Sequence, residues 1–255
     1  MAHLIIKLLL FGFLIFFSGC ARSQPESISK PIEHATWTHL LQDHVDENGM
    51  VNYAKWINDT SRLNEYLTLV KTHHPNDKYW NQSEQLAYWI NAYNAFTVQL
   101  VLRHYPIESI KDISAINIPL VYSPWDIDFI SIEGNKYDLN DIEHGIIREQ
   151  FNEPRIHFAL VCAAQSCPKL RNEAYKAVQL EAQLTDQAKA FINDASKNKI
   201  EKNNFRLSKL FLWYRGDFTK SGSLIEFLNQ YSDVKIDESA NSGYMDYNWQ
   251  LNQKN

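Results

Sequence analysis

The feature that most constrains the fold is a long helical segment whose apolar residues cover more than one face. The segment is predicted to begin at a Ser83 cap, with Glu84 in its first turn, and to end at His104, before Pro106. Its apolar positions are Leu86, Trp89, Ile90, Tyr93, Phe96, Val98, Leu100 and Val101. A helix that is apolar this far round must be covered on several sides, so we expect it at the centre of its domain.

Shorter elements are predicted on both sides of this helix. Helical periodicity indicates helices over 36–47, 61–71, 140–151, 181–195, 208–214 and 223–231. Extended patterns indicate hairpins over 129–139 and 199–207, a closing strand at 243–252, and a strand over 155–164 that is apolar on both faces and therefore lies inside a sheet. The predicted fold class is α+β, with a helical N-terminal half around the central apolar helix, packed on a small mixed or antiparallel sheet.

Composition supports a globular chain. It has 255 residues, of which 45% are hydrophobic and 22% charged, which excludes collagen-like, low-complexity and disulfide-dense classes. No G-x-G-x-x-G or G-x-x-x-x-G-K-[ST] run occurs, so a glycine-rich phosphate loop is not expected. Residues 20–32 are polar with two prolines and indicate a tether, and no second linker follows. We therefore expect one globular domain over 33–255.

The N-terminus has the pattern of an export signal. Residues 1–19 carry Lys7, then an apolar run, then small residues, and the run is too short to span a bilayer, although an uncleaved anchor is an alternative. The sequence Phe17-Ser18-Gly19-Cys20 resembles a bacterial lipobox, in which Cys20 carries the lipid. We expect a protein on the periplasmic side of the cell envelope, anchored at Cys20, with the outer membrane favoured. Cleavage after Ala21 would instead give a soluble periplasmic protein.

Charge limits the partners. Without residues 1–19 the chain has 24 Lys and Arg against 30 Asp and Glu, a formal charge of −6, and no basic cluster. This balance argues against nucleic acid and against membrane contact outside the N-terminal segment. We expect an envelope peptide, protein or glycan as partner. No cofactor is expected, and no metal site either, because C-x-x-C and H-E-x-x-H are absent and Asp126 and Asp128 indicate a solvated edge.

Two cysteines and a histidine share one short segment. His157, Cys162 and Cys167 lie between Arg155 and Pro168. In a strand His157 and Cys162 would point to opposite faces, so His157 is expected to pair with Cys167 or with a residue from elsewhere. Pro168 suits the first position of a helix, which would place Cys167 at an N-cap, where the helix dipole favours a thiolate.

Three interpretations of the cysteines stay open. Cys162 and Cys167 can close a disulfide or act as a redox-sensitive pair, Cys167 can be an activated thiol, or both can be inert core residues. The pairing with His157 as base makes Cys167 a candidate nucleophile.

Other polar residues are candidates for the same site. His144 lies beside Gly145 at the edge of a buried stripe and is a second acid–base candidate. Glu143, predicted to pair with an Asn140 cap, and Cys162 are expected in the cleft. Asn91 and Asn94 sit inside the apolar helix, where they either bind backbone groups or line the cleft.

Five blocks of the chain resemble the DUF547 family, a domain of unknown function. The blocks are Asn91–Phe96, Leu139–His144, Arg155–Ala164, Ser166–Pro168 and Tyr247–Asn252. The resemblance runs from about Trp37 to the end and implies no assigned activity. The histidine and cysteine blocks and the mixed architecture are loosely similar to papain-like and transglutaminase-like cysteine enzymes, by analogy of folds only. In transglutaminase-like enzymes the nucleophilic cysteine opens the central helix, which here carries Asn91 and Asn94, so that analogy also allows a non-catalytic binding domain.

Two functions are therefore expected as alternatives. The first is a thiol-dependent acyl transferase or amide hydrolase of the envelope, with Cys167 as nucleophile and His157 or His144 as base. The second is a non-catalytic envelope module that binds a peptide or glycan and has a Cys162–Cys167 disulfide.

Overall fold

The chain folds into helices with two small sheets. The computed structural model describes residues 27–113 and 123–254, so the expected signal segment, Cys20 and most of the tether lie outside the described residues. The helices are α1 (Ala35–His44), α2 (Tyr53–Trp56), α3 (Thr60–Lys71), α4 (Gln82–His104), α5 (Arg148–Gln150), α6 (Leu180–Ile192), α7 (Leu210–Trp213), α8 (Arg215–Phe218) and α9 (Leu224–Tyr231). The strands are β1 (Ile130–Ile132), β2 (Asn135–Tyr137), β3 (Lys199–Ile200), β4 (Asn204–Leu207) and β5 (Asn241–Tyr244). The α+β class is confirmed.

Helix α4 is the central helix that the sequence predicts. Every residue from Gln85 to Leu102 is buried, and the helix packs against α3 and against the π-helical segment η5 (Asp141–Ile147). Its predicted cap was wrong by two residues. The N-cap is Asn81, whose side chain accepts from the Glu84 N–H while the Glu84 carboxylate accepts from the Asn81 N–H. Asn81 satisfies this capping box because Glu84 lies three residues after it.

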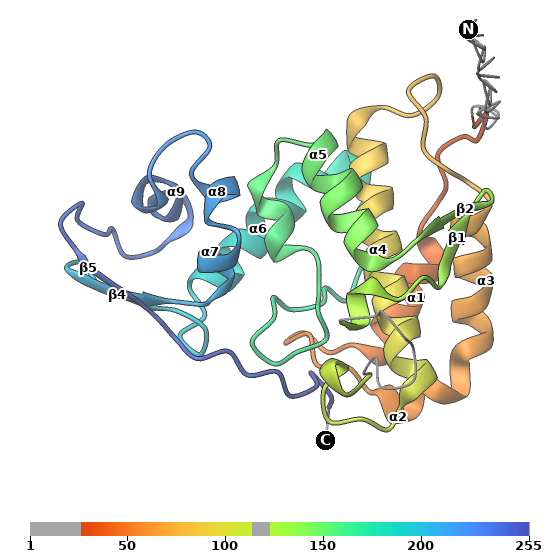
Figure 1. The fold of residues 1–255 in the computed structure, drawn as a ribbon, viewed down its shortest axis with the longest axis horizontal. Helices are drawn as coiled ribbons and strands as arrows, with labels where there is room; N and C mark the ends of the chain where they lie inside the picture. Colours follow the sequence, from red (N-terminus) through yellow and green to blue (C-terminus); the bar gives the residue numbers. More distant parts are fainter. Residues whose placement is uncertain (1–26, 114–122, 255) are drawn as a thin grey trace, which may run out of the picture.

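The three N-terminal helices pack on one another through aromatic rings, and α3 connects them to α4. The expected helices at 36–47 and 61–71 correspond to α1 and α3; α3 lies beside α4 in Figure 1, and α1 packs on α3. Trp37 of α1 stacks on Tyr66 of α3 with ring centroids 5.5 Å apart, and Trp56 of α2 lies 5.8 Å from Trp37. Such aromatic pairs add to the free energy gained by burying their large apolar area.

The two sheets are small and separate. β1 and β2 form the predicted antiparallel hairpin, with Ile130 opposite Tyr137, and it turns through Glu133 and Gly134 at positive φ. The second sheet is mixed, in the order β3-β4-β5, with β3 antiparallel and β5 parallel to β4. The predicted closing strand is only partly present, because β5 ends at Tyr244 and the chain beyond it pairs through isolated bridges.

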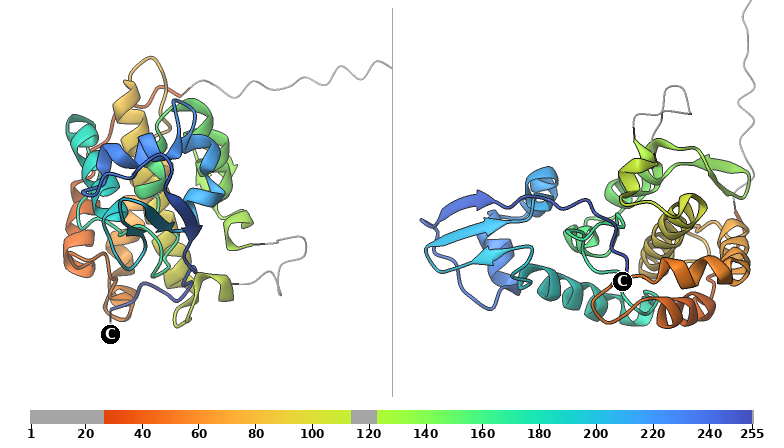
Figure 2. Two further views of the ribbon diagram at one scale, coloured as in Figure 1. Left: turned by 90° about the vertical axis from the view of Figure 1, so that its left-hand side faces the viewer. Right: turned by 90° about the horizontal axis from the view of Figure 1, so that it is seen from below.

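Two hydrophobic cores divide the molecule. The larger one surrounds α4 and includes α1, α3 and η5. The smaller one joins residues of α6, β4 and α7 to α9 around Phe158. Helix α6 packs both on the 3-10 helix η6 (Pro154–Phe158) and on α9, so it connects the two parts. Figures 1 and 2 show the resulting elongated shape, with β4, β5 and α9 at one end and α3 at the other.

The predicted strand over 155–164 was wrong. This segment is η6 followed by irregular backbone, although residues 155–161 are all buried as the sequence indicates. Its backbone groups are satisfied by short turns, such as Ala159 N–H to the Ile156 carbonyl, and by side chains of neighbouring helices. Burial on all sides gives the same apolar pattern as a central strand, so the pattern could not separate the two.

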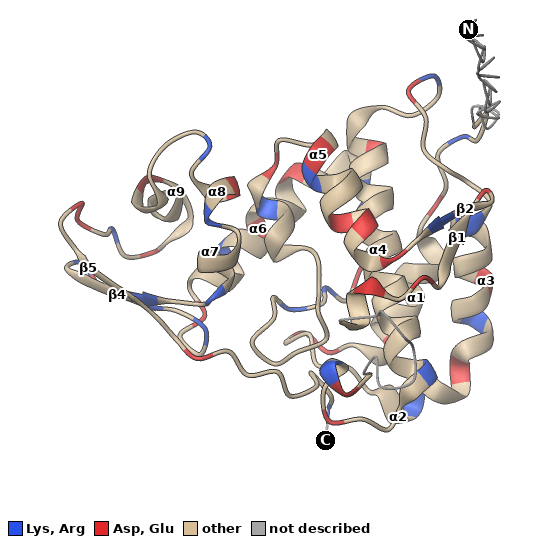
Figure 3. Cartoon of the chain, viewed as in Figure 1, with Lys and Arg blue, Asp and Glu red and all other residues tan. Residues whose placement is uncertain are grey.

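Acidic and basic side chains alternate over the described surface. Figure 3 shows Lys and Arg interspersed with Asp and Glu on most elements. Within 27–113 and 123–254, no helix is both long enough and apolar enough to cross a bilayer.

Acid should destabilise the fold through His34. Burial lowers the pKa of His34 from 6.5 to about 4, and its Nδ1 lies 2.7 Å from the Tyr66 hydroxyl. The unfolded chain binds the proton first, so this contribution to stability is complete above pH 6.5 and falls as the pH drops, by about 3 kcal/mol at pH 4. Urea unfolding at pH 7.5 and pH 4 measures it, and His34→Gln should reduce the difference by about that amount. An equal pH dependence in both proteins would contradict it.

Candidate functional site

A pocket lies between the two cores and gathers the chemically reactive residues of the described chain. Its volume is about 220 Å³. It is bounded by η5, by the segment from Leu160 to Pro168, by α7 and by the C-terminal tail after β5. The lining residues are Tyr93, Trp125, Asn140, Glu143, His144, His157, Leu160, Cys162, Cys167, Pro168, Leu210, Trp213, Tyr214, Tyr247 and Trp249.

The cysteine segment is a tight loop rather than a helix start. Ala163 adopts φ 55°, a left-handed conformation that side chains other than glycine rarely take. The Cys167 N–H then donates to the Ala164 carbonyl, which closes the loop. Residues 168–176 are irregular, so the predicted N-cap at Cys167 was wrong and this thiol does not lie at the start of a helix. The strand that was expected to separate His157 from Cys162 is absent, and both residues line the pocket.

The C-terminal tail holds this loop from the other side. The Gln165 N–H donates to the Gln250 carbonyl and the Asn252 N–H donates to the Ala163 carbonyl, both at about 3 Å. Ala164 and Leu251 form an isolated antiparallel bridge. The tail therefore fixes the strained backbone and brings Tyr247 to the cysteines.

The two thiols touch each other. Both cysteines are free, and their sulfurs lie 2.7 Å apart, farther than the roughly 2.05 Å of a covalent bond. The Sγ of Cys167 also accepts a hydrogen bond from the Cys162 N–H at 2.7 Å. The Tyr247 hydroxyl lies 3.1 Å from the Sγ of Cys162. A disulfide is within reach of this geometry, and its formation stays a prediction.

These contacts give the two thiols different pKa values. Burial on its own would raise the pKa of Cys167, but hydrogen bonds from the Cys162 thiol and N–H outweigh it, and the pKa lies below its ordinary value. Burial and the Cys167 neighbour raise the pKa of Cys162 well above its ordinary value. Cys167 is therefore the sulfur that loses its proton first, while Cys162 keeps its proton and donates it.

His157 is oriented by a carboxylate from the other core. Its Nε2 lies 2.8 Å from Oδ2 of Asp217 in α8, and Arg148 Nε donates to the same oxygen at 2.7 Å. The hydrogen bond from His157 holds the pKa of Asp217 well below its usual range. Burial lowers the pKa of His157, so the ring is neutral, with its proton on Nε2 and a lone pair on Nδ1. The ring stacks on Tyr214 at 3.8 Å.

His144 uses the other ring nitrogen for its hydrogen bond. Arg148 Nη1 lies 2.9 Å from Nδ1 of His144. Because a guanidinium only donates, Nδ1 of His144 accepts this hydrogen bond, and the ring proton sits on Nε2. The two histidines of the pocket thus differ in role: His157 offers a lone pair, and His144 offers an N–H. In the described residues, neither imidazole is hydrogen-bonded to a cysteine sulfur.

Glu143 is a buried carboxylate in the pocket wall. The Tyr93 hydroxyl of α4 donates to its Oε2 at 3.1 Å. Burial and the charge of Glu143 raise the pKa of Tyr93 and of Tyr214, so both hydroxyls keep their protons. The predicted Asn140 cap for Glu143 was wrong, because the Asn140 amide donates to Asp126.

An aromatic wall closes the outer side of the pocket. It consists of Trp125, Trp213, Tyr247 and Trp249. Neighbouring rings in this wall have centroids between 4.6 and 5.9 Å apart. Trp213 keeps 46% of its surface exposed. Large apolar rings left open beside polar groups are typical of binding sites.

Asn91 and Asn94 do not reach the pocket. Asn94 Nδ2 donates to the Ala159 carbonyl and its Oδ1 accepts from the Val161 N–H, each at 3.0 Å. Asn91 binds both backbone groups of Tyr175 in the same way. Both side chains are buried and bind backbone, which favours the first of the two sequence-based alternatives and explains why they lie outside the cleft.

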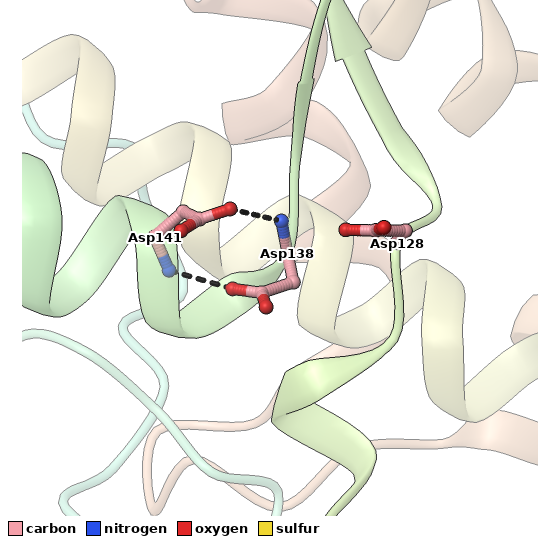
Figure 4. A group of neighbouring side chains, drawn as sticks. All are labelled: Asp128, Asp138 and Asp141. Carbon is pink, nitrogen blue, oxygen red and sulfur yellow. Dashed lines mark hydrogen bonds between the residues drawn. The ribbon is translucent and has the colours of Figure 1, made fainter. Parts of the chain in front are cut away.

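Three carboxylates near the start of η5 lie close together. Ligand oxygens of Asp128, Asp138 and Asp141 are within 4.8 Å of one another, as Figure 4 shows. The Asp138 and Asp141 carboxylates each accept from the other residue's backbone N–H, at 2.6 and 3.1 Å. This is a capping box, and it is the true start of the helix that the sequence placed at Asn140. Capping accounts for two of the three acids.

The structure brings most of the predicted site residues together. Cys162, Cys167, His144, His157 and Glu143 all line one pocket. The sequence patterns did not indicate the aromatic wall of Trp125, Trp213, Tyr247 and Trp249. They also did not indicate Arg148 and Asp217, which contact the two imidazoles, or Tyr93 and Tyr214, which lie beside Glu143. Tyr247 and Trp249 belong to the C-terminal block Tyr247–Asn252, but no sequence pattern indicated that this block lies beside the cysteines.

Asn94→Ala should lower stability. The substitution leaves the buried Ala159 carbonyl and Val161 N–H without partners, so we expect a loss of about 3 kcal/mol. Asn58→Ala, at an exposed helix position, should change stability by no more than about 0.5 kcal/mol. Urea unfolding measures both, and equal effects would show that Asn94 does not hold the cysteine segment.

Comparison with known proteins gives one family. Residues 78–192 match the sequence model of the family described as "Protein of unknown function, DUF547". No curated protein and no solved structure matches the chain. The matched segment contains α4, η5, both cysteines and α6. The resemblance to DUF547 is therefore confirmed for residues 78–192, and it stays a prediction for the rest of the chain.

Proposed function

We propose that the protein is a thiol-dependent enzyme of acyl transfer or amide hydrolysis, with Cys167 as the nucleophile and His157 as the base. One observation carries this proposal: a hydrogen-bonded Cys167 sulfur and an imidazole oriented by Asp217 line the same pocket. A nucleophile near a base that a third group orients is the recurring arrangement of covalent catalysis.

The reaction runs in two steps. Nδ1 of His157 first takes the proton of the Cys167 thiol, and the resulting thiolate attacks the acyl carbon. A C–S bond forms, and the bond to the leaving amine or alcohol breaks as that group takes the same proton back from His157. Water or an amine then attacks the thioester and loses a proton to Nδ1 of His157, and the C–S bond breaks to restore the thiolate. His157 takes this role rather than His144, because its Nδ1 is not occupied by Arg148.

A second candidate is a non-catalytic binding module with a Cys162–Cys167 disulfide. The short distance between the sulfurs favours it. In an oxidising compartment an external disulfide can exchange with the pair, so that the two thiols lose two electrons and two protons and the oxidant is reduced to thiols. The bond would occupy the Cys167 sulfur and leave the aromatic wall as a binding surface.

Labelling of Cys167 separates the two candidates. With iodoacetamide, reduced protein should react at Cys167, and the rate should rise with pH to a plateau whose midpoint lies below the ordinary thiol pKa, because hydrogen bonds stabilise the thiolate. Cys162→Ala removes one donor and should move the midpoint to higher pH, whereas Cys162→Ser keeps a donor and should move it less. Mass spectrometry of peptides identifies the labelled residue.

The labelling experiment and an acylation assay can each contradict the proposed enzyme. Protein purified without reductant that labels only after reduction would favour the binding module. For the enzyme, a p-nitrophenyl ester should leave an acyl group on Cys167, and His157→Gln should slow its release. Lys189→Gln, in the last turn of α6 and outside the pocket, is the control. A reduced protein that never acylates at Cys167 would refute the enzyme.

We also propose that the chain is exported and carries a lipid at Cys20, facing the periplasm. The support is the sequence of residues 1–21, with its basic start, apolar run and lipobox-like end. Two chemical signals are usually needed for stable anchoring, and an acylated cysteine with more than one chain provides them.

Mass spectrometry of the native N-terminus tests this location. The expected first residue is a lipid-modified Cys20, and the protein should fractionate with membranes. Cys20→Ser should release it to the soluble periplasmic fraction, while Ser23→Ala in the tether should not. An unmodified N-terminus after Ala21 would show ordinary signal cleavage instead.

A further inference from the structure

The described pocket lining carries a carboxylate and two histidines, but no permanently charged basic side chain. Among the described residues that line it there is no lysine or arginine. Glu143 keeps only 6% of its surface exposed. Its partners, Tyr93 and Tyr214, are neutral hydroxyls, so they do not compensate its charge. A buried carboxylate without a matching cation attracts a positively charged ligand.

Arg148 and His157, two groups beside the pocket that could carry a positive charge, are hydrogen-bonded to Asp217. Arg148 donates to Asp217 at 2.7 Å and to His144, so its charge is matched by Asp217. His157 gives its N–H to the same carboxylate and is neutral, since burial lowers its pKa. Glu143 therefore has no ion-pair partner among the described residues, although Arg148 lies close enough for its charge to interact with that carboxylate.

The aromatic wall already contacts one ammonium group. The Nζ atom of Lys111 lies 3.9 Å from the ring centroid of Trp249. A cation over the face of a tryptophan is attracted by the ring quadrupole. Trp213, Tyr247 and Trp125 extend the same wall along the pocket. The wall is thus chemically suited to an alkylammonium ligand.

We propose that this pocket binds the positively charged amine of a substrate, with the ammonium group between the Glu143 carboxylate and the aromatic wall. The volume of about 220 Å³ is below the roughly 300 to 1,000 Å³ of pockets for whole drug-sized ligands, so it fits an amine side chain or a small amine. The inference deepens the proposed function and rests on it in one respect, because the bound amine is the acyl acceptor. The ammonium gives one proton to the Glu143 carboxylate, and the neutral amine attacks the thioester at Cys167. The C–S bond then breaks to release the Cys167 thiolate, and the second amine proton passes to Nδ1 of His157.

Binding is tested with three probes of similar size and different charge. The protein is the reduced mature chain, and the readout is tryptophan fluorescence at constant ionic strength, because Trp125, Trp213 and Trp249 line the pocket. n-Butylammonium chloride should give a saturable change, and 1-butanol and sodium butyrate should bind at least about tenfold more weakly. Equal binding of 1-butanol would overturn the proposal, as would saturable binding of a neutral disaccharide with no response to n-butylammonium.

Two matched pairs of variants locate the site. Glu143→Gln should weaken n-butylammonium binding about tenfold or more, whereas Glu149→Gln removes the same charge from an exposed position six residues along and should not. Trp213→Leu should weaken binding, and Trp213→Phe should retain most of it because the ring remains. Circular dichroism checks that each variant is folded. Wild-type affinity in Glu143→Gln would overturn the proposal.

The acceptor role is tested separately from binding. Acylated Cys167 should transfer its acyl group to n-butylamine faster than to water, and the amide product is detected by mass spectrometry. Saturable binding without transfer would support the amine site and refute its role as acyl acceptor. If Cys167 proves unreactive to iodoacetamide while n-butylammonium still binds, the proposed enzyme fails and the amine site stands.

Discussion

The arrangement depends on buried amide side chains that take the place of a sheet. Asn91 and Asn94 of α4, with Gln183 and Gln187 of α6, bind backbone groups of the segment 158–176. Most of this segment is irregular and much of it is buried, so its buried N–H and carbonyl groups need partners that no regular strand provides. Two helices supply them, and the cysteine loop is thereby fixed between the two cores.

The fixed cysteine loop places Cys167 in a pocket whose other reactive group, His157, is held by a different part of the molecule. The loop at Ala163 is strained, and the C-terminal tail holds it by backbone hydrogen bonds. Strain of this kind persists only where the surroundings determine the backbone fully, as they do at functional sites. Cys167 then receives its hydrogen bonds from Cys162, while His157 takes its orientation from Asp217 in the smaller core. The pocket needs both cores, because its nucleophile and the carboxylate that orients its base come from different ones.

Local patterns predicted the elements better than they predicted the site. Helices α1, α3, α4, α6 and α9 and both hairpins follow from periodicity and turn residues, since each is determined by neighbours along the chain. Two of the failures share one cause. The strand at 155–164 and the Cys167 cap were judged from local residues, whereas distant partners decide those backbones: Asn94 for the first and the tail for the second. The Asn140 cap failed for a local reason, because Asp138 and Asp141 cap each other's backbone N–H groups.

Local patterns were enough to predict the α+β class, the central helix and the candidate residues Cys162, Cys167, His144, His157 and Glu143, because apolar periodicity and residue chemistry depend on neighbours along the chain. The folded arrangement was needed to establish which of these residues meet, which thiol is the more acidic, and that the aromatic wall, Arg148 and Asp217 belong to the same site. The reason is that a pKa, a tautomer and a binding wall are set by groups in contact across space. Asp217 lies 60 residues from His157, which it orients, and Tyr247 lies 85 residues from Cys162, which it contacts.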